Sequence, residues 1–208
     1  MRTAGIVLAG GAARRMSGMD KPMLRVGGSS LLAHAIGALR GAEQMVDPVI
    51  VVGPRRPGVP GVGWAREDPP GGGPVAALAA GLAALPPGPA IVVVLAGDLI
   101  GIRSSTVDKL VGALAAEAGA DGAVLVDADG RWQWLIGAWR GGPLHAALPS
   151  SPGGASIRKT LAPLTIVTVP ESPGESADVD TPADLDRHRA VKDGQLTDSS
   201  QPSHRPSS

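Results

Sequence analysis

The sequence contains no cysteine, which excludes disulfide bonds and thiolate metal sites. A metal ion bound by this chain would therefore meet oxygen ligands. Phenylalanine and tyrosine are also absent and there are only 4 tryptophans, so the core must be built mostly from Val, Leu, Ile and Ala. The lack of cysteine is compatible with a reducing compartment, and we expect the protein to be cytoplasmic.

An excess of charge of one sign is missing too, since 19 Lys and Arg residues balance 19 Asp and Glu residues. Such a chain has no overall field to attract nucleic acid or an anionic membrane surface. We therefore expect no nucleic-acid partner, and any bound anion must be held by local groups.

The sequence also lacks a long apolar run. Residues 90–97 form the longest run after the N-terminal region, and it is far shorter than the roughly 20 residues that span a bilayer as a helix. Residues 4–9 follow Arg2 and resemble the start of an export signal, but such a signal needs about 7 to 15 apolar residues. Because Arg14 and Arg15 come soon after, a first strand is the better interpretation, and we expect no association with a membrane.

The length of the chain suits one domain. At 208 residues the chain can bury a substantial core, and its length favours a single globular unit. Residues 1–191 are predicted to form that domain, since the sequence shows no internal repeat and no second core. Residues 192–208 are polar and nearly free of apolar side chains, which predicts a disordered tail.

Short apolar runs alternate with segments of helical period. The runs are apolar at almost every position, which is typical of strands covered on both faces. Strand and helix in turn predict a three-layer, Rossmann-like α/β fold with a mainly parallel central sheet and helices on both faces. The expected strands are residues 5–9, 48–53, 91–96 and 122–126, and the expected helices lie within residues 31–39, 75–85 and 107–114.

The last third of the chain continues the pattern. Residues 126–139 are predicted to form two strands joined by a turn, because the Asp-Gly at 129–130 is a hairpin dipeptide. Residues 156–164 predict a short helix and residues 165–169 a further strand. The Thr-Pro at 181–182 is typical of the N-cap and first position of a final helix.

A glycine pair follows the first expected strand, at the edge where ligands bind in folds of this kind. Gly10 and Gly11 lack Cβ atoms, so their N–H groups can approach an anion closely. Arg14, Arg15 and Lys21 add positive charge nearby, which suits a triphosphate. The segment matches neither the Walker loop nor the dinucleotide glycine pattern, and a plain Gly-Gly turn with solvated arginines is the alternative.

Acidic residues lie at other places on the same edge. Asp98 directly follows a buried strand, so its carboxylate can point into the ligand crevice and ligate Mg²⁺, although aspartate also forms turns there. Glu67 and Asp68 precede a Pro-Gly loop whose backbone groups can follow the edge of a base or sugar, although a plain linker has the same composition. Asp178 and Asp180 lie just before the final helix, where stabilisation of the helix dipole is the alternative.

Together these segments resemble the nucleotidyltransferase family typified by molybdenum cofactor guanylyltransferase. Residues 8–24, LAGGAARRMSGMDKPML, are similar to that family's Leu-Ala-Gly-Gly-x-x-x-Arg-Met-x-Gly-x-Asp-Lys signature. Residues 67–85, 93–99 and 179–185 are similar to its later segments and occur in the same order. The resemblance extends over residues 4–190.

The resemblance implies an Mg²⁺-dependent transfer of GMP from GTP to molybdopterin or the molybdenum cofactor, with release of pyrophosphate. GTP and that acceptor are the implied small-molecule partners, and molybdoenzymes or other cofactor-biosynthesis proteins are the implied protein partners. The implied catalytic residues are Arg15 and Lys21, which bind phosphates, and Asp98. The implied nucleotide-binding residues are Leu8, Ala9, Gly10, Gly11, Lys21, Asp68 and Asp98, and the implied metal ligands are Asp98 and Asp180.

Two features of the resemblance bear on the substrate. The LAGG form of the glycine pair resembles the GTP-using members, whereas cytidylyltransferase relatives tend to carry LAAG. The family usually has proline two residues after the metal-binding aspartate, but this chain has Ile100 there, and it has Asp178 and Asp180 where close relatives often have asparagine. The alternatives are a related transferase that uses CTP or another phosphate acceptor, and a nucleotide-binding protein without turnover.

Replacement of the loop lysine separates function from folding. Lys21→Ala is expected to slow nucleotidyl transfer far more than it lowers the free energy of unfolding, because an exposed surface substitution usually changes stability by no more than about 0.5 kcal/mol. Activity assays and urea unfolding measure the two effects. An unfolded variant would show that Lys21 has a structural role instead.

Overall fold

The computed structural model of the chain describes residues 2–10 and 20–178. Within these residues the strands of the central sheet are β1 (Thr3–Leu8), β4 (Val46–Val52), β5 (Gly63–Ala65), β6 (Ile91–Ala96), β7 (Gly122–Val126), β8 (Trp132–Arg140) and β9 (Ile166–Pro170). The α-helices are α1 (Leu31–Arg40), α2 (Pro74–Ala84), α3 (Ser104–Ala116), α4 (Gly141–Ala147) and α5 (Ile157–Leu161). A 3₁₀ turn η1 (Lys21–Met23) precedes a small hairpin of β2 (Arg25–Val26) and β3 (Ser29–Ser30).

The central sheet has the strand order β5-β4-β1-β6-β8-β7-β9 in the described part of the chain. Among these strands β8 is antiparallel to both of its neighbours, and the other pairings are parallel. The chain moves from β1 outward to β4 and β5 and then returns to place β6 on the other side of β1. The carboxyl ends of β1, β4 and β6 therefore meet at one edge, where this topology places a ligand crevice.

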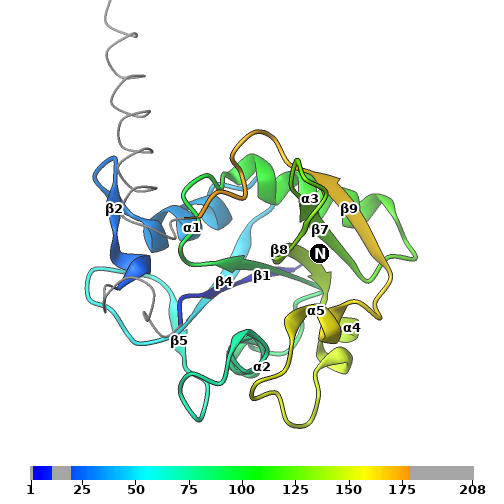
Figure 1. The fold of residues 1–208 in the computed structure, drawn as a ribbon, viewed down its shortest axis with the longest axis horizontal. Coiled ribbons are helices and arrows are strands. Elements are labelled where there is room, and N and C mark those ends of the chain that lie inside the picture. The colour runs from blue at the N-terminus through cyan, green and yellow to red at the C-terminus, as the bar shows by residue number, and fades with distance from the viewer. Residues whose placement is uncertain (1, 11–19, 179–208) are drawn as a thin grey trace, which may run out of the picture.

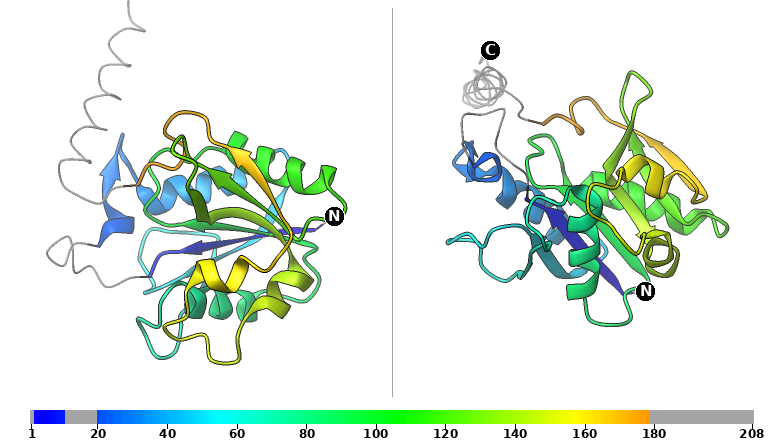
Figure 2. Two further views of the ribbon diagram at one scale, coloured as in Figure 1. Left: turned by 45° about the vertical axis from the view of Figure 1, so that its right-hand side comes forward. Right: turned by 60° about the horizontal axis from the view of Figure 1, so that its bottom comes forward.

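Helices cover both faces of the sheet (Figures 1 and 2). One buried cluster joins α1 and α3 to the sheet, with Leu32, Leu39, Val107 and Leu110 among its members. A second cluster joins α2, α4 and α5 to the opposite face, with Leu78, Leu82, Leu144 and Leu161 among its members. The expected three-layer α/β architecture with a mainly parallel sheet is confirmed.

The expected strands and helices of the described residues are present, with small shifts at their ends. The hairpin is also confirmed, and its turn is closed by hydrogen bonds from the Asp127 amide to the Arg131 carbonyl at 3.0 Å and from the Gly130 amide to the Asp127 carbonyl at 2.9 Å. Helix α4 was not expected, because it starts at Gly-Gly-Pro, which usually breaks a helix. Proline is tolerated there because first-turn amides need no partner within the helix.

The expected final helix that starts at residues 181–182 and the tail at residues 192–208 lie outside the described residues, so the domain boundary after residue 191 stays a prediction. Within the described residues, no helix has the length and the apolar character that a membrane span requires.

The core is aliphatic, as the composition requires, with one large aromatic residue fitted between glycines. Every residue of β1 is buried, and Trp139 of β8 is fully buried. A Cβ atom on Gly122 would overlap the Trp139 ring, and a Cβ atom on Gly137 would lie 2.9 Å from its Nε1. The two glycines therefore make the space that the indole occupies.

This close contact predicts a difference between two glycine substitutions. Gly122→Ala is expected to lower the free energy of unfolding by about 1 to 3 kcal/mol, because the added methyl group overpacks the core against Trp139. Gly112→Ala is the matched control, since a Cβ atom at Gly112 in α3 would meet nothing within 4 Å. That control is expected to raise stability by roughly 0.5 to 1 kcal/mol through helix propensity. Urea unfolding of both variants measures the difference, and equal effects would contradict the overpacking argument.

Candidate functional site

The carboxyl end of β1 stays paired on both sides beyond the last residue of the strand. The Ala9 amide donates a hydrogen bond to the Val52 carbonyl at 2.8 Å, and the Gly97 amide donates one to the Leu8 carbonyl at 2.9 Å. Leu8 and Ala9 are buried, whereas Gly10 is exposed. Of the predicted nucleotide-binding residues, Leu8, Ala9 and Gly10 thus lie at the carboxyl end of β1, the edge where this topology binds ligands.

Glycines flank this stretch on both neighbouring segments, the one that follows β4 and the one that follows β6. A Cβ atom on Gly53, whose φ is +149°, would lie 2.7 Å from the Ala9 carbonyl oxygen, and one on Gly97 would lie 3.0 Å from the Ala9 Cβ. Neither residue carries a side chain that could cover the edge. The end of β1 therefore offers bare backbone at the place where the fold positions ligands.

A buried arginine that belongs to none of the sequence motifs lies at the same edge. Arg56 follows β4 and is only 9% exposed. Its Nε donates to Asp20 Oδ2 at 2.7 Å, and its Nη2 donates both to Asp20 Oδ1 at 2.6 Å and to the Ala9 carbonyl oxygen at 3.0 Å. Its Nη1 donates to the Pro54 carbonyl oxygen at 3.2 Å. The signal available in the sequence was a pair of arginines that follows a buried strand after a Gly-Pro turn.

Lys21 is connected to this edge through its neighbour Asp20. It is the first residue of η1 and follows Asp20, which forms the ion pair with Arg56. Lys21 is half-buried rather than exposed, and its neighbour Asp20 is linked through Arg56 to the Ala9 carbonyl at the end of β1, so its phosphate-binding role stays a prediction. The other predicted residues of this segment, Gly11 and Arg15, lie outside the described residues.

The two acidic residues after β5 have different surroundings. Asp68 is exposed, whereas Glu67 is only 8% exposed. Glu67 Oε1 accepts a hydrogen bond from the Gly71 amide at 3.0 Å, and a Cβ atom on Gly10 would lie 3.5 Å from the same oxygen. Glu67 Oε2 has no hydrogen-bond partner within the described residues. Glu67 is therefore the acid packed against the end of β1, and the nucleoside-binding role of Asp68 stays a prediction.

Asp98 is half-buried in the turn after β6. A segment that is distant in the sequence lies beside this turn. Leu99 forms an antiparallel bridge with Asp178, and the Ile100 amide donates a hydrogen bond to the Ala177 carbonyl at 2.9 Å. The segment that carries Asp178 is therefore adjacent to the turn that carries Asp98. Asp180, the predicted second metal ligand, lies outside the described residues.

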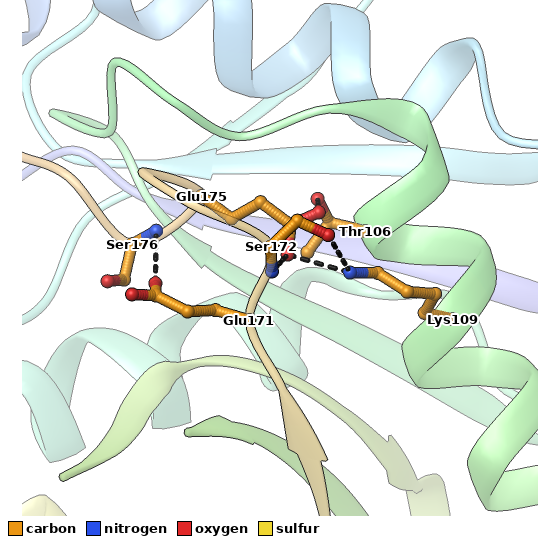
Figure 3. A network of polar contacts seen from close by, with 6 residues as sticks. All are labelled: Thr106, Lys109, Glu171, Ser172, Glu175 and Ser176. Carbon is orange, nitrogen blue, oxygen red and sulfur yellow. Dashed lines mark hydrogen bonds and ion pairs between the residues drawn. The ribbon is translucent and has the colours of Figure 1, made fainter. Parts of the chain in front are cut away.

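A network around Glu175 holds that segment on α3 (Figure 3). Glu175 is only 1% exposed, and its Oε1 accepts a hydrogen bond from Thr106 Oγ1 at 2.8 Å. Its Oε2 accepts from Lys109 Nζ and from the Ser172 amide, both at 2.7 Å. Lys109 Nζ also donates to Ser172 Oγ at 3.1 Å. Two residues of one helix thus fix the loop that leads from β9 to Asp178.

Two glycines let this loop touch the turn after Asp98. A Cβ atom on Gly101 would overlap the Gly174 carbonyl oxygen, and Gly174 has a φ of +81°, which favours glycine. The turn has Ile100 where the resembling family usually has proline. Its conformation is fixed here by the bridge to Asp178 and by this backbone contact.

The network determines the charge of Glu175. Burial by itself raises the pKa of Glu175, but the hydrogen bonds from Lys109, from the Ser172 amide and from Thr106 outweigh burial. The pKa of Glu175 therefore lies below its ordinary value, and the side chain is a carboxylate at neutral pH.

The donors at this edge suit a metal ion that is shared with a phosphate. Within the described residues, no group of three or more His, Cys, Asp or Glu side chains could hold a metal ion alone. Mg²⁺ normally uses one or two carboxylates and completes its shell with phosphate oxygens and water. The two acids on adjacent segments, Asp98 and Asp178, fit that pattern.

Comparison with known sequences gives a family match over most of the chain. Residues 5–167 match the MobA-like NTP transferase domain. A probable molybdenum cofactor guanylyltransferase from Mycobacterium avium is 34% identical over 193 residues, which are 89% of this chain and 94% of that protein. A molybdenum cofactor guanylyltransferase from Bradyrhizobium is 42% identical over 82 residues, which are 38% of this chain but only 37% of that protein's length.

Solved structures share the fold. Molybdopterin-guanine dinucleotide biosynthesis protein A from Archaeoglobus fulgidus has a TM-score of 0.70 at 19% identity, covering 93% of this chain and 100% of that chain. The Rv0371c protein from Mycobacterium tuberculosis, solved in complex with manganese, has a TM-score of 0.69 at 18% identity, covering 91% of this chain and 98% of that chain. At these identities the likeness supports the fold assignment alone.

The low pKa of Glu175 predicts how stability depends on pH. A carboxylate whose pKa is lower in the folded state stabilises the fold above its unfolded pKa, and this contribution is lost as the pH falls through the folded pKa. The parent is therefore expected to lose stability below about pH 4.5 more steeply than Glu175→Gln. At pH 7 that variant is expected to be less stable by about 1 to 3 kcal/mol, because charged hydrogen bonds are lost in a buried place.

The matched control for this prediction is Glu171→Gln in the same loop. Glu171 is half-buried and accepts a hydrogen bond from the Ser176 amide at 3.1 Å. Its replacement is expected to change the pH profile less. Urea unfolding between pH 3 and pH 7 measures both variants, and parallel profiles for the parent and Glu175→Gln would contradict the prediction.

Proposed function

This chain belongs to the family of MobA-like NTP transferase domains, and on that premise we propose that it transfers GMP from GTP to molybdopterin or the molybdenum cofactor. The chain is a nucleotidyltransferase, and the identity of its two substrates is the proposed part. One observation carries the proposal: the bare backbone of Ala9 and Gly10 lies beside the turn that carries Asp98, and Arg56 links the same edge to Asp20, the neighbour of Lys21.

The reaction makes one bond and breaks one bond. An oxygen of the acceptor's terminal phosphate attacks the α-phosphorus of GTP, and the bond from the α-phosphorus to the oxygen that bridges to the β-phosphate breaks. Pyrophosphate leaves with the electron pair of that bond. Such transfers need little covalent chemistry from the protein, so its work is to position the phosphates and to offset their negative charge.

Residues of the β1 edge are proposed to hold the nucleotide. The exposed backbone of Gly10 lets the phosphates approach closely, and Lys21 offsets their charge. Arg15 and Gly11 are proposed to act in the same place, and Asp68 to hold the nucleoside. Support for guanine as the base comes from the glycine pair and from the names of the relatives.

Asp98 is proposed to bind Mg²⁺ together with Asp180 or Asp178. The bridge between Leu99 and Asp178 supports this pairing, because it brings the two acidic segments together. A structural neighbour solved with manganese is consistent with a divalent ion in this fold. When bound, such an ion offsets charge on the reacting phosphates. A cytoplasmic location and cofactor-biosynthesis proteins or molybdoenzymes as partners belong to the same proposal.

Pyrophosphate release tests the reaction. The purified chain is incubated with molybdopterin, Mg²⁺ and each of the four NTPs in turn, and we expect release with GTP that depends on the acceptor. A clear preference for CTP would contradict the choice of base, and the absence of release with every NTP would contradict transfer to this acceptor.

Replacement of Asp98 tests the metal site. Asp98→Asn is expected to reduce kcat by about 100-fold or more, since such electrostatic stabilisation of phosphates is usually a large term. Asp129→Asn, in the exposed turn after β7, is the matched control and is expected to keep the parent's rate. Manganese titration of both variants gives a second measurement, and equal affinities would contradict the role of Asp98.

A further inference from the structure

We propose that Arg56 is a positioning residue, which fixes Lys21 against the end of β1 and thereby sets how tightly the chain holds the nucleotide's phosphates. The inference rests on the proposed function in one respect, namely that Lys21 binds phosphates. It adds a residue that neither the sequence motifs nor the resemblance contain.

The geometry joins two places that are distant in the sequence. One atom, Arg56 Nη2, donates hydrogen bonds to the Ala9 carbonyl oxygen at 3.0 Å and to Asp20 Oδ1 at 2.6 Å. The Nε of the same guanidinium donates to Asp20 Oδ2 at 2.7 Å, so the carboxylate is held by two parallel bonds. The bond from Nη1 to the Pro54 carbonyl ties the group to the chain after β4. Asp20 is thus placed relative to both β1 and β4.

Arg56 acts through Asp20 rather than on a ligand. Its side chain is 8% exposed, and the four hydrogen bonds use each of its three nitrogens. A buried guanidinium is costly unless it is paired, and here one carboxylate and two carbonyl groups satisfy it. Asp20 also offsets its charge. The group is therefore committed to the protein, and its effect on a nucleotide must pass through the residues that it places.

Lys21 is the residue that this arrangement places. It follows Asp20 directly, and the turn is held by hydrogen bonds from the Met23 amide to the Asp20 carbonyl at 2.9 Å and from the Leu24 amide to the Lys21 carbonyl at 3.0 Å. Fixing the Asp20 carboxylate therefore fixes the backbone from which the Lys21 side chain extends. A misplacement of about 1 Å in a group that contacts the reacting atoms can cost about 100-fold in rate.

The first experiment measures nucleotide binding and turnover in single variants. Arg56→Lys keeps the charge but loses the fork that binds a carboxylate through two bonds, so we expect GTP affinity by calorimetry to fall about 10-fold and KM for GTP to rise similarly. Arg56→Gln is expected to weaken binding at least as much. Arg55→Gln is the matched control, because Arg55 is the exposed neighbour, and it is expected to bind GTP as the parent does. Parent-like binding by both Arg56 variants would overturn the proposal.

The second experiment asks whether Arg56 acts through Lys21. In a chain that already carries Lys21→Ala, adding Arg56→Lys is expected to change GTP affinity less than about 2-fold, because residues that act as a unit are not additive. The full 10-fold loss in that background would overturn the proposal, since Arg56 would then act by another route. Thermal unfolding of each variant is recorded, and a loss of GTP affinity that only tracked loss of folded protein would also overturn it.

These measurements distinguish a failure of the role of Arg56 from a failure of the proposed transfer. If the parent binds another NTP better than GTP, the choice of base fails, and the same variants are measured with that nucleotide. If the parent binds GTP and the double variant is additive, the role of Arg56 fails while the proposed transfer stands. If the parent binds no NTP, the inference is overturned together with the proposed function.

Discussion

The site depends on backbone hydrogen bonds at the end of β1. They pair Leu8 and Ala9 with the segments at the ends of β6 and β4. This pairing requires that the two neighbouring segments approach Ala9 closely, which Gly53 and Gly97 permit because they have no side chain. Every other feature of the edge is placed relative to it. Arg56 binds the Ala9 carbonyl, Glu67 packs beside Gly10, and the turn with Asp98 follows from β6. The arrangement of this edge is thus a property of the three central strands rather than of any one loop.

Buried charged side chains hold loops in place in the part of the molecule that the structure describes. Among the described residues the buried charged side chains are Arg56, Glu67 and Glu175. Arg56 fixes Asp20, Glu67 accepts a bond from the Gly71 amide, and Glu175 holds the loop after β9 on α3. Arg56 connects the segments that follow β1 and β4. Glu67 closes its own loop, and Glu175 connects the loop after β9 to α3. A chain without cysteine and almost without aromatic residues therefore stabilises its loops with buried ionic hydrogen bonds.

The sequence was sufficient for the strands and helices that carry a strong pattern, and less so for contacts between distant residues. The runs in β1, β4 and β6 are apolar at nearly every position because both faces of these strands are covered. Such continuous apolar runs can be recognised without a structure. Strand β5 has three residues and shows no period. The partners of Arg56 are Asp20 and Ala9, and no local pattern encodes such a pairing. Glu67 and Asp68 are neighbours of the same type, and only their packing distinguishes them.

The bridge between Leu99 and Asp178 has a practical consequence for where the domain ends. The family match stops at residue 167, and a chain shortened there would keep nearly all of the sheet. It would nevertheless lose Gly174, Glu175 and Asp178, and with them the support of the turn after Asp98 and the partner of Lys109. The eleven residues 168–178 thus support the turn that carries Asp98 although they lie beyond the recognisable domain, and a shortened version that keeps this turn in place must include them.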